Sequence, residues 1–261
     1  MKTRKSKPAL PPSPKYGWLP DLPDHRDHLF AAGLEHLRAL PAQIDLRPEC
    51  PPVYDQGDLG SCTANAIGAA IEFDRLKQRL PDFAPSRLFI YYNERAAEHT
   101  IASDAGAQIR DGIKSVAKQG VCPEAEWPYD ISKFTLKPAP AAYASAAQHK
   151  ALSYQRVSRT LSQMRGCLAA GYPFVLGFSV YTAFEGKEVA KSGILNLPGP
   201  REKLLGGHAV LAVGYDDSAQ RFMVRNSWGE AWGQDGYFTM PYAYLLSSAL
   251  SSDFWTIRMV E

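Results

Sequence analysis

The pattern of apolar residues changes near residue 150, and this change restricts the chain to a few fold classes. Before it, apolar residues recur at helical spacing from Ser61 to Leu80, which predicts one long helix. Further helices are expected from Ser86, after the stretch "DAGAQ" with Gly120 as its end, and at about 141–149. This half of the chain therefore reads as helical.

After residue 150 the pattern is that of strands. One helix is expected in "TLSQMRGCLAAG", with Thr160 and Gln163 as a capping box and Gly171 as its end. Segments rich in β-branched and aromatic residues then predict strands at 173–184, 208–216, 221–228, 235–241 and 253–260. The chain is therefore predicted to be α+β, with a helical lobe at about 45–150, an antiparallel β lobe at about 151–261 and a cleft between them.

The first 40 residues differ from both halves. Six of the 20 prolines fall within the first 23 residues, which excludes a regular helix or a central strand there. The same segment carries apolar side chains that need a surface to lie on, at Tyr16, Trp18, Leu19, Leu22, Leu29 and Phe30. We expect residues 1–40 to form an extended arm that docks on a body formed by residues 41–261.

Charge and hydropathy exclude several classes of protein. The net charge is only +2, and five basic residues (Lys2, Arg4, Lys5, Lys7 and Lys15) lie in the arm, so the rest of the chain is mildly acidic. A basic arm can bind nucleic acid, but five charges among prolines are more typical of a solvated tail, and the mildly acidic body offers no phosphate-binding surface. No nucleic-acid partner is therefore expected. No apolar run reaches the length of about 18 residues that a membrane span needs, and the basic N-terminus lacks the apolar stretch of a classical signal peptide. The sequence does not indicate the cellular compartment.

Four cysteines, Cys50, Cys62, Cys122 and Cys167, form no CxxC pair. A disulfide between Cys50 and Cys122, each of which precedes a proline, is left open by the sequence. No cluster of ligands accompanies any cysteine, so no metal site is expected.

Cys62 lies in "QGDLGSCTANA", at the expected first turn of the long helix. Unpaired N–H groups and the helix dipole at that end favour a thiolate, which is the nucleophilic form of cysteine. The alternative is a small buried apolar residue at the start of a helix.

A thiolate needs a proton donor and acceptor, and His208 in "GGHAVLAVGYDD" is the candidate. Gly207 before it allows another backbone or a ligand to approach closely. Asn226 in "RNSWGEAWGQDGYF" can accept a hydrogen bond from one imidazole nitrogen and fix the ring, and Trp228 can shield that bond from water. Taken singly, each of these residues also fits a purely structural role.

Together the motifs resemble those of the papain-like cysteine peptidases, over most of the chain. Gln56 precedes Cys62 by six residues, His208 follows it by 146, and Asn226 lies in an "NSWG" setting, in the order of that family. The resemblance implies a two-lobed fold with a barrel-like β lobe, and a catalytic triad of Cys62, His208 and Asn226. It also implies an oxyanion hole of Gln56 and the Cys62 N–H, and no cofactor.

The resemblance also implies the substrate-binding side of the site. The helix after "DAGAQ" is similar to the segment lining the non-prime cleft, with Gly106, Gly207 and Trp228 as candidate cleft residues. A residue near Ser252 or Asp253 would partly close the main specificity pocket, where an acid would favour basic side chains. Three departures are noted: Leu59 replaces a disulfide cysteine, Thr63 replaces an aromatic residue, and "DAG" replaces a glycine pair.

The predicted function is an endopeptidase acting on protein or peptide substrates as a monomer. The arm is too short for the usual helical propeptide, but it is a candidate inhibitory segment. Two other classes of function remain: a binding protein on an inactive peptidase scaffold, and an acyltransferase or transglutaminase with the same nucleophile. Intact Gln56, Cys62, His208 and Asn226 argue against the first, and Asn226 in place of an acid argues against the second. No histidine-rich insertion that would indicate a dipeptidase is present.

Overall fold

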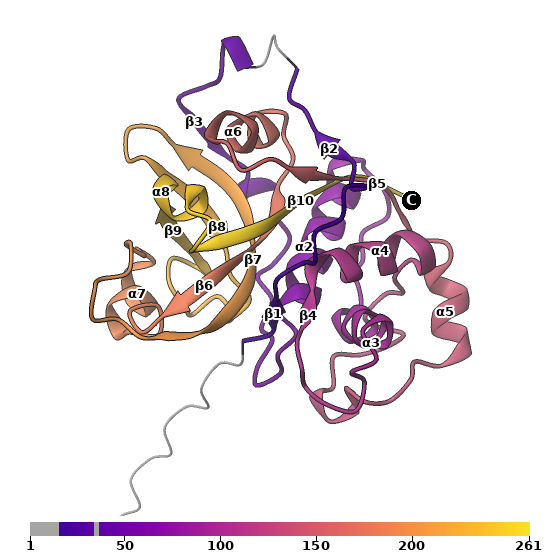
Figure 1. Ribbon diagram of the computed structural model, residues 1–261. Helices are drawn as coiled ribbons and strands as arrows, with labels where there is room; N and C mark the ends of the chain where they lie inside the picture. The colour runs from indigo at the N-terminus through magenta and orange to yellow at the C-terminus, as the bar shows by residue number, and fades with distance from the viewer. Residues whose placement is uncertain (1–15, 34–36) are drawn as a thin grey trace, which may run out of the picture.

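A helical region and a large, mostly antiparallel sheet lie side by side, with the N-terminal arm running between them (Figure 1). The structure is a computed structural model that describes residues 16–33 and 37–261. The five basic residues of the tail and His36 lie outside the described residues. The α+β fold predicted from the sequence is confirmed.

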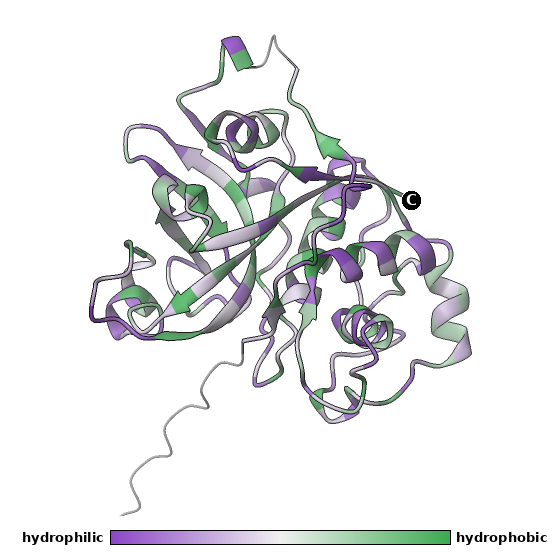
Figure 2. Cartoon of the chain, in the orientation of Figure 1, coloured by the Kyte–Doolittle hydropathy of each residue, from purple (hydrophilic) through white to green (hydrophobic). Residues whose placement is uncertain are grey.

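The helices of the first half are α2 (Cys62–Lys77), α3 (Arg87–Ala97), α4 (Ile109–Gln119) and α5 (Pro140–Ala146). Ser86 caps α3 by accepting a hydrogen bond from the Phe89 N–H, and Gly120 ends α4 with a φ of 78°. Hydrophobic and hydrophilic residues alternate along α4 (Figure 2), as an amphipathic helix on the surface requires. The long helix ends at Lys77, slightly before the predicted Leu80.

The main sheet contains eight strands, in the order β2-β5-β10-β6-β7-β8-β9, with β3 paired to β7. The predicted strands are present as β6 (Phe174–Tyr181), β7 (Leu204–Asp216), β8 (Arg221–Arg225), β9 (Tyr237–Pro241) and β10 (Ser251–Val260). Helix α6 (Leu161–Ala169) is also present where it was predicted. Thr160 caps it, but the Gln163 side chain accepts from the Ala32 N–H of the arm instead of closing a capping box.

Several short elements were not predicted. They are the strands β3 (Gln43–Asp45) and β5 (Ala151–Val157), the helices α7 (Lys187–Ser192) and α8 (Tyr242–Leu246), and the 3₁₀ turns η1 (Arg47–Glu49) and η2 (Ile131–Lys133). Strand β5 carries half-buried polar residues through its middle, so it lacks the clean alternation that marks a strand. Its partners β2 and β10 lie far away in the sequence.

Helix α2 is the element that joins the two regions. Its sequence is rich in small residues, and all but its last two residues are buried. It packs against β7 and β10 of the sheet and against α3 and α4 on the other side. Close packing of a buried helix fixes the position of its first residue, Cys62, relative to the strand that carries His208.

The arm adds two short parallel strands to the body. Strand β1 (Trp18–Leu19) pairs with β4 (Ala107–Gln108), and β2 (Leu29–Phe30) pairs with β5. Phe30 is 6% exposed and belongs to the hydrophobic core. The part of the arm that the structure describes therefore lies on the body, as its apolar residues predict. The boundary between the two lobes near residue 150 stays a prediction.

Ion pairs hold the arm between its two strands. Asp27 accepts from the guanidinium groups of Arg110 (2.6 Å) and Arg156 (3.1 Å), and its side chain is 5% exposed. Charge-assisted hydrogen bonds of this kind are stronger than neutral ones.

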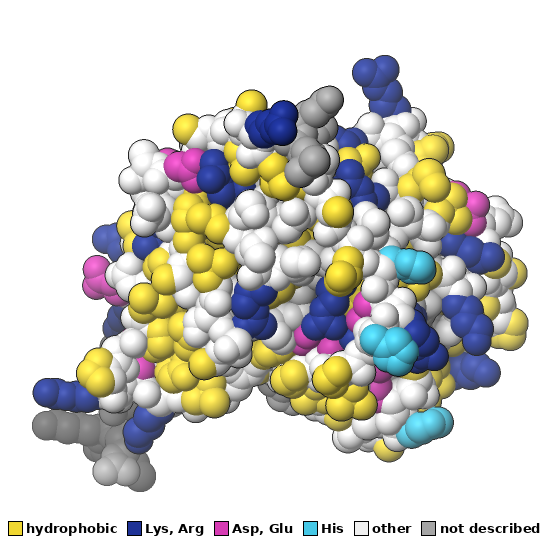
Figure 3. All heavy atoms as spheres, turned by 45° about the horizontal axis from the view of Figure 1, so that its top comes forward, with side chains coloured by type: hydrophobic (Ala, Val, Ile, Leu, Met, Phe, Trp, Pro, Cys, Tyr) yellow, Lys and Arg dark blue, Asp and Glu magenta, His cyan; other side chains and the backbone are white. Residues whose placement is uncertain are grey.

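On the face shown in Figure 3, lysine and arginine side chains lie in several separate places instead of forming one continuous patch.

All four cysteines carry free thiols, so the Cys50–Cys122 disulfide that the sequence left open is not formed. No helix within residues 16–33 and 37–261 is both long and apolar enough to cross a membrane.

Candidate active site

Cys62 is the first residue of α2, with Ser61 at the N-cap. Its side chain is fully buried, and its Sγ accepts a hydrogen bond from the backbone N–H of Ala209, 3.4 Å away on β7. The helix N-terminus places unpaired N–H groups and the positive end of the helix dipole beside the sulfur. This environment favours negative charge on Sγ whenever the group is in contact with water.

His208 lies on β7, next to Ala209, and its ring is fixed by Asn226. The His208 Nε2 and Asn226 Oδ1 atoms are 2.8 Å apart. The Trp228 ring covers the pair, with its centroid 5.1 Å from that of His208 and the two rings inclined by 32°. Within the described residues, Nδ1 of His208 has no hydrogen-bond partner. The hydrogen bond to Asn226 therefore leaves the other ring nitrogen available for proton transfer.

Gln56 is held at both ends of its amide. Its Nε2 donates to the Leu59 carbonyl (2.9 Å), and its Oε1 accepts from the Ser227 hydroxyl (2.7 Å). Ser227 also donates its backbone N–H to Asn226 Oδ1. Sequence reasoning missed Ser227, although its position directly after Asn226 in "NSWG" was visible.

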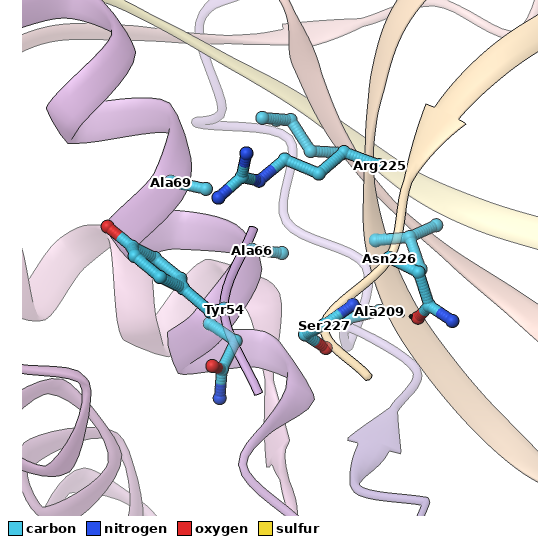
Figure 4. A pocket seen from close by; sticks show the side chains of 10 residues that line it. Tyr54, Ala66, Ala69, Ala209, Arg225, Asn226 and Ser227 are labelled. Atoms are coloured by element: carbon cyan, nitrogen blue, oxygen red, sulfur yellow. Dashed lines mark hydrogen bonds between the residues drawn. The ribbon is translucent and has the colours of Figure 1, made fainter. Parts of the chain in front are cut away.

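The end of β8 brings these residues to α2. Figure 4 shows Asn226 and Ser227 where the strand ends, across from Ala66 and Ala69 of the helix. The small alanine side chains allow the strand to approach the helix closely. Gln56 and Cys62, six residues apart, thus lie in one site with His208 and Asn226 from the far end of the chain.

The arm lies directly over this site. A Cβ atom on Gly17 would lie 1.7 Å from the Gly60 carbonyl oxygen, so only glycine fits there. The Gly17 carbonyl accepts from the Ala107 N–H (2.7 Å), and its N–H faces the Cys62 sulfur. On one side of it, the Tyr16 ring lies 6.1 Å from the His208 ring and 6.3 Å from the Trp228 ring.

On the other side of Gly17, the Trp18 indole fills a space over the face of the paired strands β6 and β7. Cβ atoms on Gly177 and Gly207 would lie 2.2 Å and 2.5 Å from its ring. Its Nε1 donates to Oδ2 of Asp253 (3.1 Å), and the Asp21 N–H donates to the same oxygen (2.9 Å). We call this space, bounded by Gly177, Gly207 and Asp253, the Trp18 site.

Burial under the arm changes the ionisation of the central pair. Burial raises the pKa of the Cys62 thiol to about 12, although backbone N–H groups act in the opposite direction. Burial also lowers the pKa of His208 to about 4, against the effect of its bond to Asn226. In this covered state both groups are therefore neutral near pH 7.

Gly106 meets the arm but not through its N–H. That N–H donates to the Tyr91 hydroxyl (3.2 Å), and the neighbouring Ala107 N–H is the one that reaches Gly17. The segment expected to contact a substrate backbone therefore contacts the arm. Within the described residues, no group of three or more histidine, cysteine or acidic side chains is arranged to hold a metal ion.

Known proteins similar to this chain are cysteine proteases or resemble them. The model of the family described as "Papain family cysteine protease" matches residues 40–249. The crystal structure of xylellain, a cysteine protease from Xylella fastidiosa, superposes with a TM-score of 0.90, 44% identity and coverage of 98% of this chain and all of that one. An uncharacterized peptidase C1-like protein, L477, from Acanthamoeba polyphaga mimivirus is 43% identical over 95% of this chain and 88% of its own length. The cathepsin B-like protein CP2 of Giardia intestinalis is 32% identical over 77% of this chain and 69% of its own length.

Proposed function

This chain belongs to the papain family of cysteine proteases, and we propose that it is a cysteine endopeptidase whose N-terminal arm covers its active site. The observation that carries the proposal is the grouping of Cys62, His208 and Asn226 beneath the arm. Within the family, the absence of a histidine-rich insertion favours an endopeptidase over a dipeptidase.

Each member of the group takes one role in peptide hydrolysis. The Cys62 thiolate attacks the peptide carbonyl and forms a covalent acyl-enzyme. His208 donates a proton to the leaving amine, and later accepts one from the water molecule that releases the acyl group. Asn226 holds the ring in the orientation that both steps need, through the 2.8 Å contact to Nε2.

The oxyanion that develops on the carbonyl is stabilised by the Gln56 amide and the backbone N–H of Cys62. The Ser227 hydroxyl and the Leu59 carbonyl already orient the Gln56 amide, so no reorganisation is needed as charge develops. A preorganised donor of this kind is typically worth about 100-fold or more in rate.

Replacing Gln56 by alanine is expected to lower kcat for peptide hydrolysis by about 100-fold with little change in KM, because the lost donor acts mainly in the transition state. Steady-state kinetics on a fluorogenic peptide measure both constants. Ser227→Ala is the matched control, since it keeps the Gln56 donor and loses only one of its supports. A 100-fold rise in KM with kcat unchanged for Gln56→Ala would instead indicate a role in ground-state binding.

The position of the arm supports an inhibitory role. His208 protonates the leaving amine, so the C-terminal part of a substrate lies toward His208 and Trp228, where Tyr16 now lies. The N-terminal part then lies toward the Trp18 site. The arm runs from Tyr16 to Trp18, opposite to that direction, and so it fills the site without presenting a peptide bond in the direction of a substrate.

The Trp18 site supports a preference for long side chains with an N–H donor. The glycines Gly177 and Gly207 leave room for a large group, and the Asp253 carboxylate lies at the far end. Arg156 pairs with Oδ1 of Asp253, and both Trp18 and Asp21 donate to Oδ2, so departure of Trp18 frees one acceptor position on Oδ2. An arginine side chain of a substrate can reach the same oxygen.

Asp253→Asn is expected to reduce the preference for arginine over leucine by about 10-fold at the substrate position whose side chain enters the Trp18 site. The reason is that a hydrogen bond to a charged group is worth about 1.5–3 kcal/mol. Asparagine tolerates the φ of 58° at this residue, so the backbone is retained. Positional scanning with a peptide library measures the effect. Ser252→Ala is the matched control, and an unchanged arginine preference in Asp253→Asn would contradict the assignment.

Product analysis separates hydrolysis from the two other classes of function. Incubating a peptide with the protein, with and without a primary amine, distinguishes a peptidase, which releases the free acid in both cases, from an acyltransferase. We expect the free acid as the main product in both. An absence of any product after release of the arm would favour the inactive scaffold.

A further inference from the structure

Asp104 lies outside the catalytic group, but it contacts the loop that carries Gln56 and Cys62. Its carboxylate oxygens accept from the backbone N–H of Gly60, at 3.0 Å and 3.1 Å. The Tyr91 hydroxyl donates to the same carboxylate at 2.5 Å. A charged acceptor thus ties the loop before the nucleophile to helix α3.

The Gly60 N–H belongs to the same peptide group as the Leu59 carbonyl, and that carbonyl orients Gln56. It accepts from the Gln56 Nε2 at 2.9 Å and from the Ser61 N–H at 2.8 Å. Because a peptide group is planar and rigid, its N–H and its carbonyl cannot turn independently. Fixing the N–H with Asp104 therefore fixes the direction in which the carbonyl holds the Gln56 amide.

The loop that carries Asp104 is itself held in place by residues of helix α3. The buried guanidinium of Arg95 stacks on the Tyr91 ring, 4.0 Å from its centroid, and donates to the carbonyls of Ile101 and Ser103. Tyr91 is fully buried, and its hydroxyl also accepts from the Gly106 N–H. The carboxylate therefore sits on a rigid, hydrogen-bonded support at the end of the segment that contacts the arm.

We propose that Asp104 is a positioning residue that orients the Gln56 oxyanion donor through the Leu59–Gly60 peptide group. In this chain the loop contains Leu59 and no disulfide, since all four thiols are free. The hydrogen bonds of Asp104 hold the loop without a covalent bond. This inference rests on the proposed oxyanion role of Gln56.

The test is a double-mutant cycle in the full-length Gly17→Val chain, in which the arm is expected to leave the site. Asp104→Ala is expected to lower kcat about 10-fold with little change in KM, because misplacement of a catalytic group by a fraction of an ångström has an effect of that order. In the Gln56→Ala background the same change should lower kcat less than 2-fold. Asp104→Asn, which keeps one acceptor for the Gly60 N–H, should recover most of the lost rate.

Two control variants separate positioning from general stability. Asp58→Ala removes an exposed carboxylate from the same loop and should leave kcat unchanged. Tyr91→Phe leaves the Gly60 contact in place and should lower kcat less than Asp104→Ala does. Melting temperatures measured on all variants show whether each is folded. If Asp104→Ala is unfolded at the assay temperature, the whole cycle is run at a temperature below its melting point.

The outcomes distinguish the two proposals. If Gln56→Ala leaves kcat unchanged, the oxyanion role and the positioning role are both wrong. If Gln56→Ala has its expected effect but Asp104→Ala lowers kcat equally in both backgrounds, Gln56 keeps its role and the positioning by Asp104 is rejected.

Discussion

The Gly17→Val variant is expected to hydrolyse a peptide substrate about 1,000-fold faster than the unmodified chain. The added side chain cannot fit beside the Gly60 carbonyl, which a Cβ atom would approach to 1.7 Å. The arm must then leave, and with it the contacts of Tyr16 and Trp18. Burial of two aromatic side chains stabilises the docked arm by roughly 4 kcal/mol in total, and each 1.4 kcal/mol corresponds to a factor of ten.

Gly17→Val acts locally, which makes it a sharper test than removal of the whole arm. Phe30 belongs to the core, so deleting residues 1–38 would also destabilise the body. In Gly17→Val the ion pairs of Asp27 and the strand β2 remain. A chain lacking only residues 1–20 is the second variant and should show the same activation.

Gly199→Val is the matched control for this prediction. Gly199 lies in an exposed loop where a Cβ atom would meet its nearest neighbour, Glu202, at an ordinary distance of 3.7 Å. The rate should stay that of the unmodified chain. Equal rates for the unmodified chain, Gly17→Val and the chain lacking residues 1–20 would show that the arm does not inhibit.

The local signals in the sequence were sufficient for the fold class and most elements. Helices α2, α3, α4 and α6 were predicted because apolar spacing and end signals such as Ser86, Gly120 and Thr160 act within a few residues. Strand β5 was missed because its identity depends on β2 and β10, more than 90 residues away in each direction. Pairing over such distances leaves no local pattern.

In the site, too, local motifs could be predicted from the sequence and contacts between distant segments could not. Gln56, Cys62, His208 and Asn226 could be proposed from motif order alone, and the structure brings them together. The contacts of Asp104 with Gly60, and of Trp18 with Asp253, join segments 44 and 235 residues apart. Such contacts depend on how the chain packs, so the residue types alone did not indicate them.

The thiol of Cys62 is expected to react with iodoacetamide at pH 5.5 about 1,000-fold faster in Gly17→Val than in the unmodified chain, because the unmodified chain is labelled only when the arm opens. Only the thiolate reacts, and burial under the arm raises the pKa of this thiol to about 12. Almost no thiolate exists at pH 5.5 in that state. Uncovered, Cys62 keeps the helix N-terminus and gains a charged His208, conditions that lower a cysteine pKa to between about 3.5 and 7.5.

The faster labelling in Gly17→Val follows from the ionisation of Cys62 and His208 together. Burial lowers the pKa of His208 to about 4, so in the covered chain the imidazole is neutral at pH 5.5 and offers no charge to a thiolate. Contact with water removes that penalty, the imidazole gains a proton as the thiol loses one, and each charge stabilises the other. The pair then persists between its two pKa values, so the labelling rate of the Gly17→Val chain should fall only at pH values below the new pKa of Cys62.

Cys50, Cys122 and Cys167 serve as internal controls in this experiment. All three are free, and burial raises the pKa of each thiol, so none should be labelled at pH 5.5. Mass-spectrometric mapping identifies the modified residue, and Cys62→Ala should abolish both the fast labelling and the hydrolysis. Slow labelling of Cys62 in Gly17→Val, with hydrolysis retained, would contradict a preformed ion pair and indicate that His208 removes the thiol proton as the sulfur attacks the peptide carbonyl.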